Sequence, residues 1–110
     1  MDQPSLNEEA LSDATSEEII AALFQQLVMQ QTNMALMFLG RIPHPETKET
    51  LVDLASAKLY VDQLEMLENR TRGNLTPKEG GLLRKSLVTA RGYLVDALEG
   101  VGEDHEAAGE

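Results

Sequence analysis

The sequence predicts an all-α fold: a three-helix domain, arranged as a helical hairpin or bundle and flanked by disordered acidic tails. Apolar residues recur at helical spacing in three segments, and Gly- and Pro-containing turns separate these segments. No run alternates with the period of two that a half-buried strand requires. The predicted helices cover residues 17–39, 53–71 and 77–98, within a domain formed by residues 16–99.

The acidic residues are concentrated at the two ends of the chain. The formal net charge is −10, and six of the 19 acids lie in residues 1–18 and five in residues 99–110, with no Lys or Arg in either segment. Both ends are poor in aromatic and β-branched residues, so they bury too little apolar surface to offset the entropy of ordering. We therefore predict acidic, disordered tails at residues 1–15 and 100–110.

The first helix is the central element, because residues 19–39 contain no charged side chain. Thr15 and Glu18 match a capping box that begins the helix, and Gly40, followed by two prolines, is suited to end it. The residues expected to face the core are Ile20, Leu23, Phe24, Leu27, Met34 and Phe38, with Gln31 among them.

The opposite side of this helix is polar but uncharged. It carries Gln25, Gln26, Met29, Gln30, Thr32, Asn33 and Leu36. One interpretation is a solvated amide face, and the other is burial against a second copy of the chain, with amides fixing the register. We predict the second, with a dimer favoured among homo-oligomers. The candidate self-association residues are Gln26, Met29, Gln30, Asn33 and Leu36, with Leu59 and Met66 of the second helix.

A membrane-spanning role for residues 19–39 is disfavoured. The segment is long enough to cross a bilayer, but its amide side chains would each need a partner in the hydrocarbon. Two acids, Glu17 and Glu18, precede it where a signal peptide carries basic residues. We therefore predict no membrane insertion.

The second and third helices have their own start and stop signals. Asp53 is suited to cap the second helix, Gly73 to end it, and Thr76 with Glu79 to cap the third, which we expect to end near Gly100. The predicted core residues are Leu54, Ala57, Tyr60, Val61, Leu64 and Leu67 in the second helix and Leu83, Leu87, Ala90, Leu94, Ala97 and Leu98 in the third. Three glycines inside the third helix each cost about 1 kcal/mol relative to Ala.

Basic residues are concentrated between residues 70 and 91. These are Arg70, Arg72, Lys78, Arg84, Lys85 and Arg91, against the single acid Glu79. The favoured interpretation is a solvated helix surface, partly neutralised by the acidic tails. The alternative function is that of an adaptor that binds an anionic partner, such as RNA, acidic lipid or an acidic protein segment. Few aromatic residues lie among these bases, which disfavours nucleic acid.

Residues suited to catalysis or metal binding are scarce. There is no Cys, and His44 with Glu46 and Glu49 does not match an established metal-ligand spacing. No Ser lies in a nucleophile-elbow setting. We therefore predict no enzyme and no cofactor, with an enzyme using the loop at residues 43–45 as a remote alternative. The absence of Cys and of a signal peptide predicts a cytoplasmic protein.

The middle of the chain resembles a family of small bacterial proteins known as domain of unknown function 1844. The resemblance lies in ALMFLG at residues 35–40, IPHPET at 42–47, VDQLEMLE at 61–68 and TRGNLT at 71–76, and it runs from about residue 19 to residue 98. It implies a short, cytoplasmic, helical protein with no assigned reaction and no catalytic positions. The family pattern has Gly where this chain has Lys48.

Overall fold

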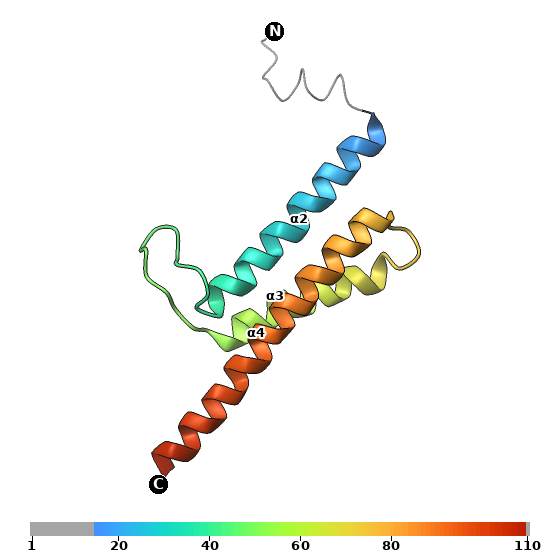
Figure 1. The fold of residues 1–110 in the computed structure, drawn as a ribbon. Coiled ribbons are helices and arrows are strands. Elements are labelled where there is room, and N and C mark those ends of the chain that lie inside the picture. Colours follow the sequence, from blue (N-terminus) through green and yellow to red (C-terminus); the bar gives the residue numbers. More distant parts are fainter. Residues whose placement is uncertain (1–14, 110) are drawn as a thin grey trace.

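The computed structural model describes residues 15–109, with side chains described for residues 15–100. It contains the helices α2 (Ser16–Phe38), α3 (Leu54–Arg70) and α4 (Pro77–Gly109), and no strand within the described residues. Each helix packs against the other two. Helices α2 and α4 run in the same direction and α3 runs back between their ends (Figure 1). The predicted all-α, three-helix fold is confirmed.

Side-chain caps begin all three helices, as predicted. Thr15 Oγ1 accepts a hydrogen bond from the Glu18 N–H at 3.1 Å, and the Glu18 carboxylate accepts one from the Thr15 N–H at 2.9 Å. Thr76 and Glu79 form the same reciprocal pair at 3.1 and 3.0 Å. Asp53 Oδ1 accepts from the N–H three residues later at 3.1 Å. Each cap satisfies N–H groups that have no partner inside the helix.

The predicted end of α2 at Gly40 is also confirmed. Gly40 has a φ of 76°, in the left-handed region that glycine adopts without steric cost. Its N–H donates to the Met37 carbonyl at 3.0 Å, and the Arg41 N–H donates to the Leu36 carbonyl at 2.9 Å. These two bonds form a Schellman motif, which satisfies the last carbonyls of the helix.

Helix α4 does not end near Gly100, and this predicted boundary is wrong. The helix continues to Gly109. Residues 101–109 contain no proline and include Glu and Ala, both good helix formers, so the glycines at positions 100 and 102 do not stop the helix. The side chains of residues 101–110 and all of residues 1–14 lie outside the described part, and the disorder predicted for the tails stays a prediction.

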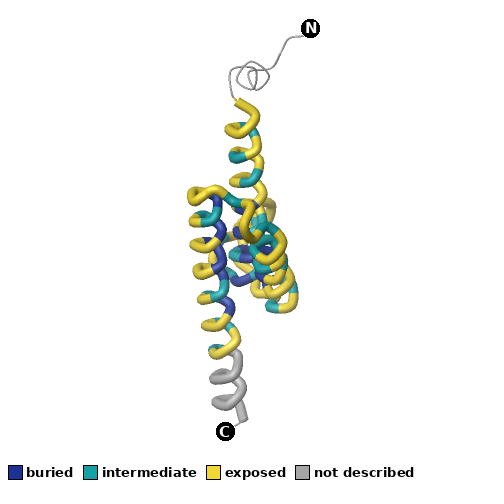
Figure 2. The backbone as a smooth tube through the Cα atoms, turned by 90° about the vertical axis from the view of Figure 1, so that its right-hand side faces the viewer, coloured by how far each residue is buried: buried dark blue, intermediate teal, exposed yellow. Residues whose placement is uncertain are grey.

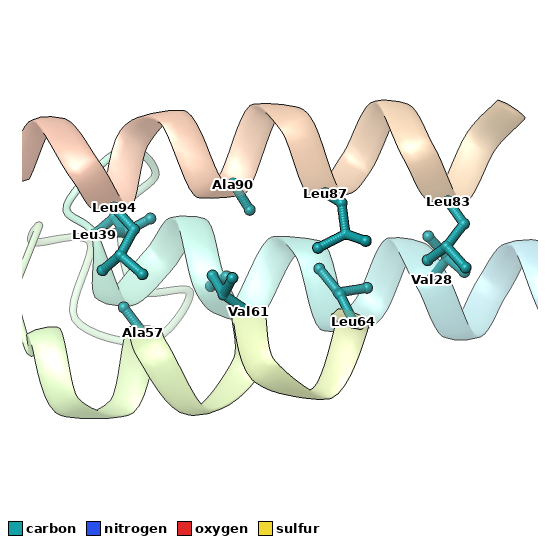
Figure 3. Close-up of a cluster of buried hydrophobic side chains, with 10 residues drawn as sticks. Val28, Leu39, Ala57, Val61, Leu64, Leu83, Leu87, Ala90 and Leu94 are labelled. Atoms are coloured by element: carbon teal, nitrogen blue, oxygen red, sulfur yellow. The ribbon is translucent and has the colours of Figure 1, made fainter. Parts of the chain in front are cut away.

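The core lies along the line where the three helices meet (Figure 3). Its largest fully buried side chains are Leu64, Leu83, Leu87, Val28 and Val61. Each helix also contributes one fully buried alanine: Ala35, Ala57 and Ala90. Because alanine is short, these positions permit close approach of the helix axes, and the leucines fill the space between them.

The predicted core face of α2 is wrong by a rotation of the helix. The residues that face the core are Val28, Thr32, Ala35 and Leu39, whereas Phe24 and Phe38 are only partly buried. Thr32 was expected on the opposite side. It is tolerated in the core because its hydroxyl donates to the Val28 carbonyl at 2.7 Å. Large apolar residues such as Leu23 and Leu27 dominate the sequence pattern. The side of α2 that is buried consists mainly of the smaller Val28, Thr32 and Ala35.

The core predictions for the other helices are largely confirmed. In α3, Ala57, Val61 and Leu64 are buried and the other three predicted residues are half-buried. In α4, the predicted residues from Leu83 to Leu94 are buried, but Leu98 is 51% exposed. Leu94 is packed in the cluster with Leu39, at the end of α2, so α2 does not extend far enough to cover Leu98.

Hydrogen bonds order the segment that joins α2 to α3. The His44 N–H donates to the Glu49 carbonyl and the Lys48 N–H to the His44 carbonyl, both at 2.9 Å. The Arg41 guanidinium lies 4.2 Å from the centre of the Tyr93 ring, which ties the segment to α4. Lys48 has a φ of 63°, the one positive φ at a non-glycine residue among those described.

Candidate interaction surfaces

Large apolar side chains remain exposed along one side of α2 and α3. On α2 these are Ile20, Leu23 and Leu27, which are 53%, 60% and 41% exposed, and on α3 they are Leu59 and Met66, which are 54% and 49% exposed. We call these five residues the α2–α3 apolar surface. In Figure 2 the first half of α2 extends past the other helices and contains no buried residue.

Side chains of α2 and α3 lie next to each other within this surface. Leu27 and Met66 line the same small hollow of about 200 Å³, together with Gln31, Gln63 and Leu67. The Gln31 amide N–H donates to the Gln63 side-chain oxygen, so this inter-helix pair is satisfied inside the monomer. Leu23 and Ile20 continue from Leu27 at helical spacing, and Leu59 lies one heptad from Met66. The apolar residues therefore form one surface and not isolated positions.

The structure divides the residues predicted for self-association. Leu59 and Met66 belong to the α2–α3 apolar surface, while Gln26, Met29, Gln30 and Asn33 are exposed and Leu36 is half-buried. At 100° per residue, Met29 lies about 160° around α2 from Leu27, on its other side. Gln30 lies between these two sides, beside Leu23. Contact of these residues with a second chain stays a prediction.

Sequence reasoning missed Ile20, Leu23 and Leu27 as surface residues because it assigned them to the core. The predicted lengths of the helices could have indicated that these residues are exposed. At 1.5 Å per residue, the 23 residues of α2 extend about 35 Å, and the 17 residues of α3 extend about 26 Å. One end of α2 must therefore project past α3, and Ile20 and Leu23 in that end stay more than half exposed.

The predicted basic patch is partly neutralised within the chain. Arg84 Nη2 lies 3.2 Å from Glu68 Oε2, and Arg91 Nε lies 2.8 Å from Glu65 Oε2, so both arginines pair with acids of α3. Arg70 and Arg72 lie at the end of α3 and beyond it, whereas Lys78 and Lys85 belong to α4. The six residues thus belong to two helices and the turn between them. Binding of an anionic partner by them stays a prediction.

The loop histidine stabilises a turn. His44 Nδ1 accepts hydrogen bonds from the backbone N–H groups of Glu46 and Thr47, at 3.1 and 3.4 Å. Within the described residues, no group of three His, Cys, Asp or Glu side chains could hold a metal ion.

On the exposed surface of α3, the hydrogen bond from Lys58 Nζ to Asp62, 2.8 Å long, raises the pKa of Lys58 above its usual value. Such a helix-surface pair adds little to stability.

A second hollow lies between the beginnings of α2 and α4. Its volume is about 350 Å³. Ala21, Phe24 and Leu82 form its apolar lining, and Glu18 and Lys78 add one charge of each sign. Glu79, the buried polar residue of the lining, accepts a hydrogen bond from the Thr76 N–H at 3.0 Å.

The fold and these surfaces define a small three-helix protein whose exposed features are apolar stripes. The sequence matches the family described as Domain of unknown function (DUF1844) over residues 21–96, and the chain belongs to this family. No curated protein and no solved structure gives a significant match. None of the described helices is sufficiently long and apolar to cross a membrane.

Proposed function

We propose that this protein is a non-catalytic interaction protein that self-associates as a dimer through the α2–α3 apolar surface and acts as a scaffold. The observation that carries the proposal is the exposure of Leu23 and Leu27, 60% and 41%, together with the position of Leu27 beside Met66 on the neighbouring helix. Within the described residues, eleven large hydrophobic side chains are exposed, the same number as the hydrophobic residues that are buried. Exposed apolar residues that form one patch indicate an interaction site.

The chemistry of this surface favours a second copy of the chain as its partner. A two-fold contact brings the same patch from both copies together, so like charges at its centre would repel. Residues 19–39 contain no charged side chain, and amides such as Gln30 lie beside the apolar stripe. The α2 part of the surface, which is uncharged and bordered by polar amides, is therefore compatible with self-pairing. A standard interface buries about 800 Å² on each partner.

Two substitutions on opposite sides of α2 test the proposal. Leu27 and Met29 are almost equally exposed, at 41% and 42%. Sedimentation equilibrium should show self-association of wild type, weaker association for Leu27→Glu, and no change for the matched control Met29→Glu. Leu23→Glu should act like Leu27→Glu, and circular dichroism confirms that each variant is folded.

Two outcomes of these measurements would contradict the proposal. A wild-type chain that is monomeric at about 100 μM, where a standard interface would be occupied, would rule out the dimer. Dissociation by Met29→Glu but not by Leu27→Glu or Leu23→Glu would transfer the contact to the amide side of α2, where Gln26 and Asn33 also lie.

A further inference from the structure

Helix α4 has a second exposed stripe on the side turned away from the core. Its residues follow one another at alternating spacings of four and three, as a and d positions do in a coiled coil. They are Gly81, Lys85, Val88, Gly92, Val95 and Glu99, and all six are exposed. We call them the α4 outer stripe. At its centre Val88 is 57% exposed and Val95 is 48% exposed.

The glycines of this stripe have no role inside the chain that explains them. A Cβ built on Gly81 or Gly92 would have no atom within 4 Å, so packing within the monomer does not require glycine there. Neither residue has a positive φ, so the backbone conformation does not require it either. Each glycine costs about 1 kcal/mol relative to Ala in a helix interior. A surface without Cβ atoms does, however, allow another backbone to approach closely.

The charges along the stripe are arranged for a second α4 running in the opposite direction. An antiparallel pair with its two-fold axis near residue 90 places Val88 opposite the partner's Gly92. The same symmetry places Glu99 opposite the partner's Gly81. Since residues three and four apart are neighbours on a helix, Glu99 then lies between Lys78 and Lys85 of the partner. A parallel pair would instead place Lys85 and Glu99 against their own copies.

We infer that the α4 outer stripe binds the α4 outer stripe of a second copy in antiparallel orientation, with Val88 packed over the partner's Gly92. This contact does not depend on the proposed function, because the α2–α3 apolar surface uses none of its residues. Where both contacts form, two separate two-fold interfaces on each protomer link dimers into larger assemblies. The α4 contact thereby gives the scaffold a means of growing beyond a dimer.

A substitution that improves the helix but obstructs the contact tests this inference. In a Leu27→Glu chain, which lacks the other proposed contact, sedimentation should still show concentration-dependent association. Adding Gly92→Ala should raise the melting temperature at low concentration, because Ala is the better helix former. It should also weaken association at least about tenfold, a change of about 1.4 kcal/mol.

Gly80→Ala is the matched control, since Gly80 is not in the stripe and a Cβ there also meets no atom within 4 Å. It should leave association unchanged. A Leu27→Glu chain that is monomeric at every concentration, or that associates equally well with Gly92→Ala, would overturn the α4 contact. Wild-type association that survives Leu27→Glu and is abolished by Gly92→Ala alone would support the α4 contact and contradict the α2–α3 dimer.

Disulfide cross-linking tests the direction of the pair, and the chain contains no natural cysteine. In the antiparallel arrangement residue 85 lies opposite the partner's residue 95, within the short distance that a disulfide needs. A mixture of Lys85→Cys and Val95→Cys chains should therefore form a covalent heterodimer on mild oxidation, while neither variant alone should cross-link efficiently. Cross-linking of Val95→Cys with itself, or none in the mixture, would overturn the antiparallel pair.

Discussion

Lys48 has a backbone conformation that most residues avoid. Its φ of 63° lies in the left-handed region, which costs residues with a Cβ roughly 1–2 kcal/mol. The turn around it is held by the Lys48 N–H to His44 carbonyl bond of 2.9 Å and by the backbone N–H groups that donate to His44 Nδ1. Glycine adopts this conformation without that cost.

Lys48→Gly should therefore stabilise the protein. We expect the free energy of unfolding to rise by about 0.5–1 kcal/mol, since the relief of strain exceeds the added entropy of the unfolded chain. Thermal melting followed by circular dichroism would show an increase of a few degrees for a domain of this size. Lys48→Ala is the control, because it shortens the side chain but keeps the Cβ, and it should give no increase. A lower melting temperature for Lys48→Gly would show that the turn is not strained.

The helix boundaries could be predicted because they depend on neighbouring residues. Thr15, Asp53 and Thr76 each satisfy N–H groups within three residues, so the cap is visible in the sequence whatever surrounds it. Gly40 ends α2 through a backbone conformation that is equally local. The far end of α4 was not predictable in this way, because residues 101–109 contain glycine but neither a proline nor another strong stop signal.

The orientation of α2 depends on its neighbours, and the sequence alone did not determine it. A helix that packs on two others buries the side that faces the space between them. In α2 this side contains Val28, Thr32 and Ala35. Hydrophobicity favours the larger Leu23 and Leu27 for that role, but Leu23 is 60% exposed and Leu27 lies beside Met66 at the surface. The candidate surface was therefore predictable only on α3, where Leu59 and Met66 fall outside a clear core stripe.

Two alanine substitutions in α2 test which side faces the core. Val28→Ala should lower the free energy of unfolding by about 1–2 kcal/mol, because Val28 is fully buried and its loss leaves a cavity. Leu23→Ala removes a larger side chain, yet at 60% exposure it should cost less than about 0.5 kcal/mol. Urea titrations at protein concentrations too low for association provide both values. A larger loss for Leu23→Ala would restore the originally predicted core face.

At the scale of the whole molecule, the three helices bury one narrow core and leave two apolar stripes on different sides. The α2 part of the α2–α3 apolar surface is uncharged, whereas the α4 outer stripe has the base Lys85 in its first half and the acid Glu99 at its end. Both features are compatible with a two-fold contact between identical chains. Association through either surface stabilises the folded state and makes the stability depend on protein concentration.

The first half of α2 is where association should be most visible. Ile20 and Leu23 are more than half exposed there, and the first buried residue of the helix is Val28. In an isolated chain these turns have few packing contacts to prevent fraying, so their amide hydrogens should exchange rapidly. A second copy that covers the apolar residues would slow this exchange.

Amide hydrogen exchange as a function of protein concentration tests this claim most directly. Exchange in residues 16–27, followed by mass spectrometry, should slow as the concentration rises through the association range, and Leu27→Glu should abolish the effect. The exposed loop at residues 41–50 provides an internal reference whose exchange should remain constant. Exchange in residues 16–27 that is independent of concentration, in a range where sedimentation detects oligomers, would contradict a contact through α2.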